Sequence, residues 1–169
     1  MLNKMRGFGC AIFFAIIFFP ASPTLFGQEA SGENAFAVET KGTIILGGGY
    51  FEPASLEALK KRFVELAGRS AAALVIIPTA NARLEPAVRP GPSTPLADYE
   101  KTARAAFEPL GIRQITILHT RDRKVASSDG FIAPLKRANC VWIPGGRLNL
   151  LKEAYSGTLL QQNLRTVLE

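Results

Sequence analysis

The chain has 169 residues, of which 47% are hydrophobic and 20% are charged, with 15 glycines and 11 prolines. This composition is typical of one globular domain, and it excludes the disordered, collagen-like and coiled-coil classes. The net charge is +6, from 20 basic and 14 acidic residues. Because this excess is small and scattered along the sequence, we expect no nucleic-acid partner.

The N-terminus has the pattern of a secretory signal. Lys4 and Arg6 precede an apolar stretch at 8–19, which small residues and prolines follow. The stretch is shorter than the ~20 residues of a membrane-spanning helix, so we expect export, to the periplasm or the medium, and no permanent membrane anchor. Two cleavage points fit, after Gly27 or after Ala37. We assign 1–27 as signal peptide and 28–40 as a flexible lead-in, rich in small and polar residues.

The remaining residues, 41–169, alternate strands with helices. Short apolar runs predict strands at 43–46, 73–77, 114–118 and 140–143. Apolar residues at helical spacing predict a helix at 53–67, and we expect further helices at 96–110, 130–137, 148–155 and 158–168. Unbroken apolar strands that alternate with helices are typical of a parallel sheet buried on both faces. The sequence therefore predicts an α/β fold whose parallel sheet is flanked by helices on both faces.

The last predicted strand, 140–143, has an unusual position in this pattern. A further βα repeat would next add a fifth strand, and without it one apolar edge of 140–143 would stay unpaired. We therefore expect 41–169 to be the N-terminal part of a larger domain. An edge of this kind recruits another chain, so a homodimer is one expected outcome.

The residues that follow each strand are the candidates for a binding site, because open parallel sheets bind ligands outside the carboxyl ends of their strands. Four arginines follow predicted strands and would gather on one rim: Arg83, Arg121, Arg123 and Arg147. Guanidinium groups there suit a substrate that carries a carboxylate. Arg147, fixed by its glycine neighbours, is the strongest candidate, and solvated surface arginines are the alternative.

Two glycine clusters also follow predicted strands. The cluster Gly47–Gly49 lacks the G-x-G-x-x-G spacing, and no acidic residue ends the second strand, so we expect no nicotinamide cofactor. No other cofactor and no metal is indicated. Before Arg147, the pair Gly145 and Gly146 leaves main-chain N–H groups free to point at an anion or a developing oxyanion. A plain turn at a helix start is the alternative for this pair.

The chain has one histidine and two cysteines. No G-x-S-x-G motif accompanies His119, so we interpret it as a rim or packing residue and not as a catalytic base. Cys10 falls in the signal peptide, so the mature chain can form neither a disulfide framework nor a thiolate metal site. Cys140 begins a predicted strand, and we expect it to be a buried small apolar residue.

Four segments resemble the cyanophycinase and aspartyl dipeptidase family of serine peptidases, which has the class I glutamine amidotransferase-like fold. They are GTIILGGG at 42–49, RFVELAG at 62–68, VIIPTA at 75–80 and VWIPGGR at 141–147. Their order and spacing also match the family. The segment from Glu153 to Thr158 is similar to the exported branch. The resemblance implies a flavodoxin-like parallel sheet and the activity of a serine-type hydrolase.

In that family the nucleophile is a serine in a G-[ST]-S-A-G elbow after the next strand, and its histidine and acid partners lie further on. None of these is present in 1–169, so the resemblance implies a chain truncated before the nucleophile strand and inactive alone. The glycine pair of the family supplies an oxyanion N–H, which corresponds to Gly146. Arg147 would lie in the substrate cleft with Gly145, Gly48 and Arg121. Many members have glutamine where this chain has Leu148, which argues against cyanophycin as the substrate.

Three functions stay open at this point. The first is an exported serine peptidase that cleaves peptide or isopeptide bonds beside acidic residues. The second is a non-catalytic α/β module that binds a small anion, and the third is an amidotransferase-like protein without peptidase activity. A G-[ST]-S-A-G elbow encoded downstream of Glu169 would favour the enzyme, and a natural stop there would favour the module.

Overall fold

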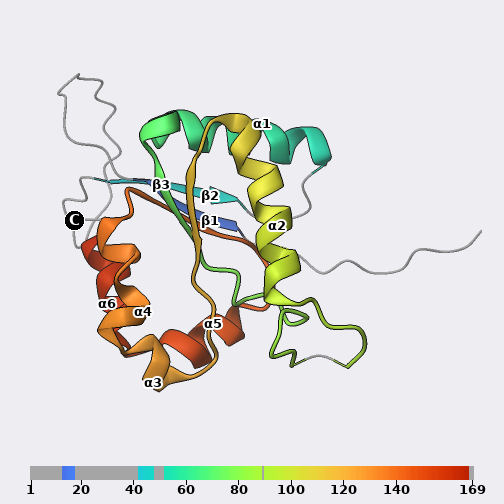
Figure 1. The fold of residues 1–169 in the computed structure, drawn as a ribbon, viewed down its shortest axis with the longest axis vertical. Helices are drawn as coiled ribbons and strands as arrows, with labels where there is room; N and C mark the ends of the chain where they lie inside the picture. The colour runs from blue at the N-terminus through green and yellow to red at the C-terminus, as the bar shows by residue number, and fades with distance from the viewer. Residues whose placement is uncertain (1–12, 18–41, 48–51, 89, 168–169) are drawn as a thin grey trace, which may run out of the picture.

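The computed structural model describes residues 13–17, 42–47, 52–88 and 90–167. They include one five-stranded sheet in the order β2-β1-β5-β3-β4 (Figure 1). The strands are β1 (Phe13–Ile17), β2 (Thr43–Gly47), β3 (Ala73–Ile76), β4 (Gln114–Ile117) and β5 (Cys140–Ile143). The α-helices are α1 (Pro53–Leu66), α2 (Leu96–Phe107), α3 (Arg123–Ala126), α4 (Asp129–Ile132), α5 (Leu148–Tyr155) and α6 (Leu159–Thr166). Single 3₁₀ turns are at Arg69–Ala71, Glu108–Leu110 and Leu135–Arg137.

Strands β3, β4 and β5 form the parallel half of the sheet. Val75 of β3 lies opposite Thr116 of β4 and Val141 of β5, in parallel register on both sides. Successive side chains of a strand point to opposite faces, so Leu74 and Ile76 face the side opposite to Val75. All three β3 residues are at most 2% exposed. The prediction of an α/β fold with a parallel sheet covered on both faces is confirmed for this half.

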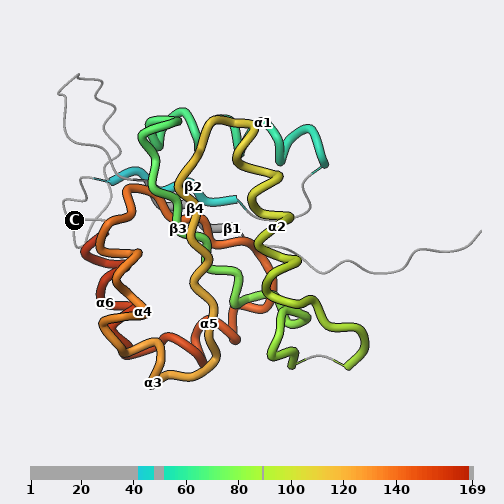
Figure 2. The backbone as a smooth tube through the Cα atoms, viewed as in Figure 1, coloured from blue at the N-terminus to red at the C-terminus, as the bar shows by residue number. Residues whose placement is uncertain are grey.

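One face of the sheet is covered by α1 and α2, and the other by α3 to α6 (Figures 1 and 2). On the first face an aromatic cluster joins both helices to the sheet. The ring of Trp142 in β5 makes edge-to-face contacts with Phe63 of α1 and Phe107 of α2. The distances between ring centroids are 5.1 Å and 5.5 Å. Such edge-to-face contacts add to the stabilisation that burial gives.

The second face is built from shorter helices. Val141 and Ile143 of β5 pack there with residues of the four helices and of the turn at 135–137, among them Ala126, Ile132, Leu135, Ala154 and Leu160. The predicted helix 130–137 is divided into α4 and a 3₁₀ turn, with Pro134 between them, because proline interrupts the helical hydrogen bonds. Helix α3 was not predicted; Asp122 caps it by accepting a hydrogen bond from the Lys124 amide at 2.7 Å.

Strand β1 changes the expected pairing of β5. It lies antiparallel to both β5 and β2, so that Ala15 is opposite Trp142 on one side and Ile45 on the other. The prediction that 140–143 keeps an unpaired edge is therefore wrong for the intact chain, because residues assigned to the signal peptide occupy that position. Since β1 runs against both neighbours, β2 points the same way as β5, and the four predicted strands share one direction.

Strand β2 is less buried than the predicted parallel strand. Ile44 is 45% exposed and Leu46 is 67% exposed, although Ile45 between them packs against the cluster of the first face. The second-face cluster consists of residues from other elements. The expectation that this apolar run is buried on both sides is wrong, because the described helices of the second face do not cover β2.

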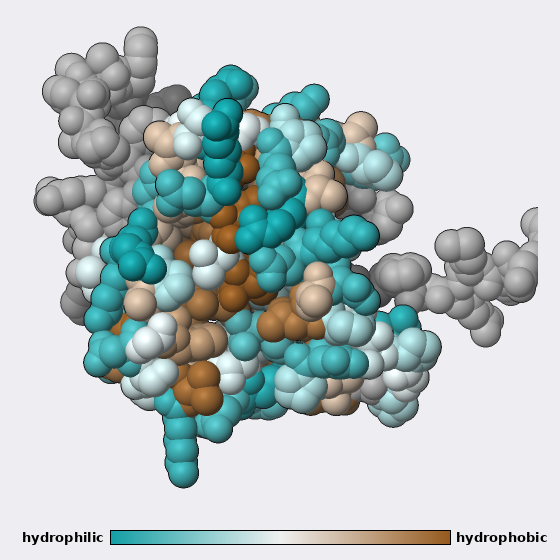
Figure 3. Space-filling model, in the orientation of Figure 1, coloured by the Kyte–Doolittle hydropathy of each residue, from teal (hydrophilic) through white to brown (hydrophobic). Residues whose placement is uncertain are grey.

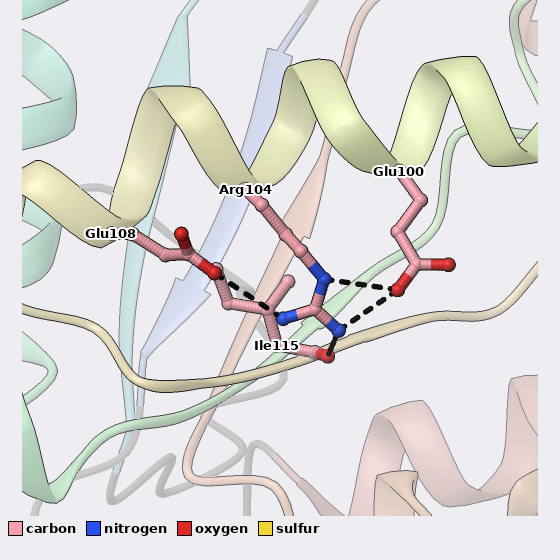
Figure 4. A network of polar contacts seen from close by, with 4 residues as sticks. All are labelled: Glu100, Arg104, Glu108 and Ile115. Carbon is pink, nitrogen blue, oxygen red and sulfur yellow. Dashed lines mark hydrogen bonds and ion pairs between the residues drawn. The ribbon is translucent and has the colours of Figure 1, made fainter.

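At the opposite edge of the sheet, an arginine bonds one outward-facing carbonyl of β4. The Leu118 amide bonds Ile76 of β3, so the alternation of the ladder turns the Ile115 carbonyl outward. Nη2 of Arg104 in α2 donates to that carbonyl at 3.0 Å, and Glu100 and Glu108 flank the guanidinium (Figure 4). Figure 3 shows apolar side chains in the region between α2 and the helices of the second face. Arg104 therefore hinders the addition of another strand here.

The rest of the predicted N-terminal organisation, including residues 18–27 and the lead-in 28–40, lies outside the described residues. Among the described residues, no helix has the length and apolar character needed to cross a bilayer.

Candidate functional site

The carboxyl ends of β3, β4 and β5 form a common rim. The segment after β3, residues 79–86, is here called the rim loop. It lies against the turn between β5 and α5, where the Arg147 amide donates to the Ala80 carbonyl at 2.8 Å. Gly146 has a φ of +155°, and a Cβ at this position would lie 2.3 Å from the Ala80 carbonyl oxygen. Only glycine fits here, because any side chain would collide with backbone.

The glycine pair leaves one amide accessible. Gly145 is half-buried and Gly146 is exposed. The Arg147 amide is already bonded to Ala80, whereas the Gly146 amide has no hydrogen-bond acceptor within the described part of the chain. The Gly146 amide is therefore the donor that an anion at this turn can meet. Its oxyanion role and the substrate contact of Gly145 stay predictions, and Gly48 lies outside the described residues.

Two of the four predicted rim arginines extend into solvent. Arg147 and Arg83 are both exposed, and neither guanidinium has a partner among the described residues. The backbone of Arg83 is held by the side chain of Asn81, which accepts its amide hydrogen at 3.0 Å. The Ala80 contact brings the segment that carries Arg83 against the turn that carries Arg147. Both guanidiniums can therefore bind a carboxylate without breaking an existing contact.

Arg121 holds the rim loop instead. Its guanidinium donates to three backbone carbonyls. Nε bonds the Pro86 carbonyl at 2.8 Å, Nη1 the Thr79 carbonyl at 3.2 Å and Nη2 the Asn81 carbonyl at 2.9 Å. Burial lowers the pKa of the Arg121 guanidinium, and the nearby Tyr155 and Glu153 act in the opposite direction and raise that pKa. These contacts give Arg121 a structural function, and the substrate contact predicted for it stays a prediction.

Arg123 likewise supports backbone. It donates to the Glu153 carbonyl at 3.2 Å and to the Ser156 carbonyl at 2.6 Å. These carbonyls lie in the last turn of α5 and at its C-cap, where helical partners are missing. Arg123 therefore stabilises the end of α5, and the predicted cluster divides into two structural and two solvent-facing arginines.

A chain of hydrogen bonds joins the rim to the interior. The Thr79 hydroxyl contacts Nδ1 of His119 at 2.8 Å and the Tyr155 hydroxyl at 2.5 Å. Nε2 of His119 contacts the Glu85 carbonyl at 3.0 Å, and the Tyr155 hydroxyl accepts from the Thr120 amide at 3.4 Å. Thr79 is 0% exposed and Tyr155 is 5% exposed. The chain therefore ties the end of β3, the end of β4, α5 and the rim loop together.

The protonation of this chain follows from its surroundings. Burial lowers the pKa of His119, and the nearby Arg121 lowers it further, while the bond to Glu85 acts in the opposite direction. Burial raises the pKa of Tyr155. At neutral pH the imidazole and the phenol are therefore both uncharged.

The sequence analysis interpreted His119 as a rim or packing residue but did not predict its partners Thr79 and Tyr155. The signal was present in part, since a tyrosine on the core side of an amphipathic helix needs a partner for its hydroxyl.

Cys140 is 0% exposed, and burial raises the pKa of its thiol to about 12. The thiol therefore stays protonated, in keeping with the predicted small apolar residue. No group of three or more His, Cys, Asp or Glu residues suitable for a metal ion occurs among the described residues.

Comparison of the chain with protein-family models, curated proteins and solved structures found no match in any of the three.

Proposed function

We propose that this chain is the substrate-binding part of an exported, cyanophycinase-like serine peptidase with a flavodoxin-like, class I glutamine amidotransferase-like sheet. Its reaction would be hydrolysis of peptide or isopeptide bonds beside acidic residues. The observation that carries the proposal is the turn at Gly145–Arg147. Contact with Ala80 fixes this turn, which presents one amide and one guanidinium at the carboxyl end of β5.

In this proposal, the turn binds the substrate in two places. The guanidinium of Arg147, with Arg83 beside the same loop, binds the carboxylate next to the scissile bond. When a serine oxygen attacks the scissile carbonyl carbon and a base takes the serine proton, negative charge develops on the carbonyl oxygen. The Gly146 amide donates to that oxygen.

The nucleophile, base and acid are assigned to sequence downstream of Glu169. His119 does not fit the role of base, because its Nδ1 is bonded to Thr79 and its Nε2 to the Glu85 carbonyl. Loss of the members of a catalytic triad lowers turnover by about 10⁴- to 10⁶-fold even when the oxyanion donors are kept. We therefore expect residues 1–169 alone to bind acidic peptides without cleaving them.

A non-catalytic module that binds small anions is the second candidate. It is supported by the same exposed arginines and by the engagement of both nitrogens of His119, the one histidine of the chain. Both candidates bind an anion through the exposed arginines. They differ in whether a serine nucleophile lies beside that binding site.

The test uses the protein encoded by the full reading frame, with acidic and neutral dipeptides as substrates. Arg147→Ala is expected to lower kcat/KM for the acidic dipeptides by roughly 10- to 150-fold, with little change for the neutral ones. Arg113→Ala is the matched control, because this exposed arginine precedes β4 at the other end of the strand.

Equal losses on both substrate types would contradict the proposed role of Arg147. Binding of acidic peptides that depends on Arg147, without any hydrolysis by the full-length protein, would reject the peptidase and favour the module.

A further inference from the structure

The two end bonds of the hydrogen-bond chain at His119 have fixed directions. At one end the Glu85 carbonyl can only accept, so Nε2 of His119 carries the hydrogen. At the other end the Thr120 amide can only donate, so the Tyr155 hydroxyl accepts there.

The bonds between these ends follow from the neutral imidazole. Nδ1 is then an acceptor, so the Thr79 hydroxyl donates to it and accepts in turn from the Tyr155 hydroxyl. Every donor in this arrangement has an acceptor. No buried side-chain nitrogen or oxygen lacks a partner among the described residues.

Protonation of Nδ1 cannot be accommodated in this arrangement. A protonated imidazole donates from both nitrogens, so Nδ1–H would face a Thr79 hydroxyl that already donates toward it. If that hydroxyl turned toward Tyr155, the tyrosine would receive two hydrogens and its own would lose its acceptor. An unmade hydrogen bond of a buried group is unfavourable, and Thr79 and Tyr155 are both buried.

We propose that His119 is a pH-operated latch that holds the rim loop closed when its imidazole is neutral and loosens it when Nδ1 is protonated. Protonation removes the bond between Nδ1 and Thr79 that holds the ring in place, and displacement of the ring then breaks the bond from Nε2 to the Glu85 carbonyl of the loop. The loop also contacts the turn of Arg147 through Ala80. The latch stands whether or not the proposed peptidase function holds, because the titration and amide exchange that test it do not involve activity.

The groups around the latch act on His119 in two directions, because Arg121 opposes protonation and the bond to Glu85 favours it. From its own segment, Arg121 opposes a positive imidazole, and it also bonds three carbonyls of the rim loop. From the loop, the Glu85 carboxylate is bonded to the Ser93 hydroxyl at 2.6 Å. From α5, Tyr155 is uncharged at neutral pH and Glu153 acts on Arg121. From the end of β3, the contact is the uncharged Thr79.

The sign of the effect follows from the lowered pKa of His119. The unfolded or opened loop leaves the imidazole near its ordinary pKa of about 6.5 and therefore binds a proton more readily than the closed state. The free energy that favours closure has its full value above that pH and decreases as the pH falls from 6.5 toward the lowered pKa of the closed state. One proton changes the opening equilibrium by at most about tenfold for each pH unit.

The experiment uses the intact chain, in which the His119 ring gives a single set of imidazole NMR signals because no other histidine is present. We would titrate it from pH 7.5 to 4.5 and follow the exchange of the rim-loop amide hydrogens at 80–85 in the same samples. The expected result is one coincident transition below pH 6.5, with exchange in the loop rising up to about tenfold per pH unit beyond the intrinsic pH effect.

His119→Gln supplies the control, because glutamine has a donor and an acceptor but does not titrate. It is expected to remove the pH dependence of loop exchange. The proposal is overturned if His119 titrates at or above 6.5 without a change in the loop. It is also overturned if the glutamine variant keeps the same transition. Should that variant fail to fold, the coincidence of the two transitions in the natural chain still decides the question.

Discussion

The two halves of the sheet carry similar apolar sequences but differ in burial. In the parallel half, β3 and β5 are almost completely buried, with Val141 at 0% and Leu74 at 1% exposed. In the other half, Leu46 of β2 is 67% exposed although its strand reads Thr-Ile-Ile-Leu-Gly. The difference is that helices cover both faces of the first half, while the described helices cover one face of β2.

An apolar run therefore specifies a strand more firmly than it specifies the burial of that strand. Burial of a strand depends on the elements that follow it in the chain and on where they pack. The parallel half is also the part that positions the rim, since β3, β4 and β5 end at the latch and at the glycine turn. We therefore regard β3–β5 with their helices as the stable unit of this chain.

The largest effect is expected from truncating the core of the parallel half. Phe63 is 0% exposed and lies edge-to-face against Trp142 and Phe107. Phe63→Ala removes these contacts and leaves a cavity, so we expect it to lower the free energy of unfolding by about 3–5 kcal/mol. Denaturant unfolding followed by tryptophan fluorescence measures this, because the chain has one tryptophan.

Leu46→Ala is the matched change in the other half. Since most of the Leu46 side chain is already in water, we expect a loss of under about 1 kcal/mol. If Leu46→Ala destabilised the protein as much as Phe63→Ala, the two halves would be equally packed and the comparison would be wrong.

An effect on association is expected from removal of the predicted signal peptide. Both candidate cleavage points, after Gly27 and after Ala37, lie beyond β1, so either would detach it. The β1-facing edge of β5 would then be unpaired, and chains would associate through it. Sedimentation velocity at rising concentration compares 28–169 with the intact chain. Identical sedimentation of the two would contradict this expectation.

Much of the fold could be predicted from local pattern. The strand 140–143 and the helix 148–155 have the predicted bounds. The helix 96–110 is observed as α2 and a 3₁₀ turn closed by Gly111 at a φ of +106°. The pairing of 13–17 with β5 could not be predicted, because a signal-like apolar segment and a strand share the same composition.

The sequence predicted which residues lie at the rim more accurately than it predicted what those residues contact. The rule that ligands lie beyond strand ends placed Arg83, Arg121 and Arg147 at the rim from the sequence. It could not tell that Arg121 and Arg123 bind backbone carbonyls, because those carbonyls belong to loops and helix ends placed only by the tertiary fold. Nor could it show that Gly146 is required by the approach of Ala80, 66 positions earlier in the sequence.

Hydrogen–deuterium exchange of the intact chain tests the central comparison most directly. The amides of Ile77 and Leu118, which extend the ladders of the parallel half, bond to Trp142 and Ile76 at 2.9 Å each. We predict that these and the other paired amides of β3 and β5 exchange at the rate of global unfolding, while the paired amides of β2 exchange at least tenfold faster by local opening. Equal protection of β2 and β3 would contradict the account.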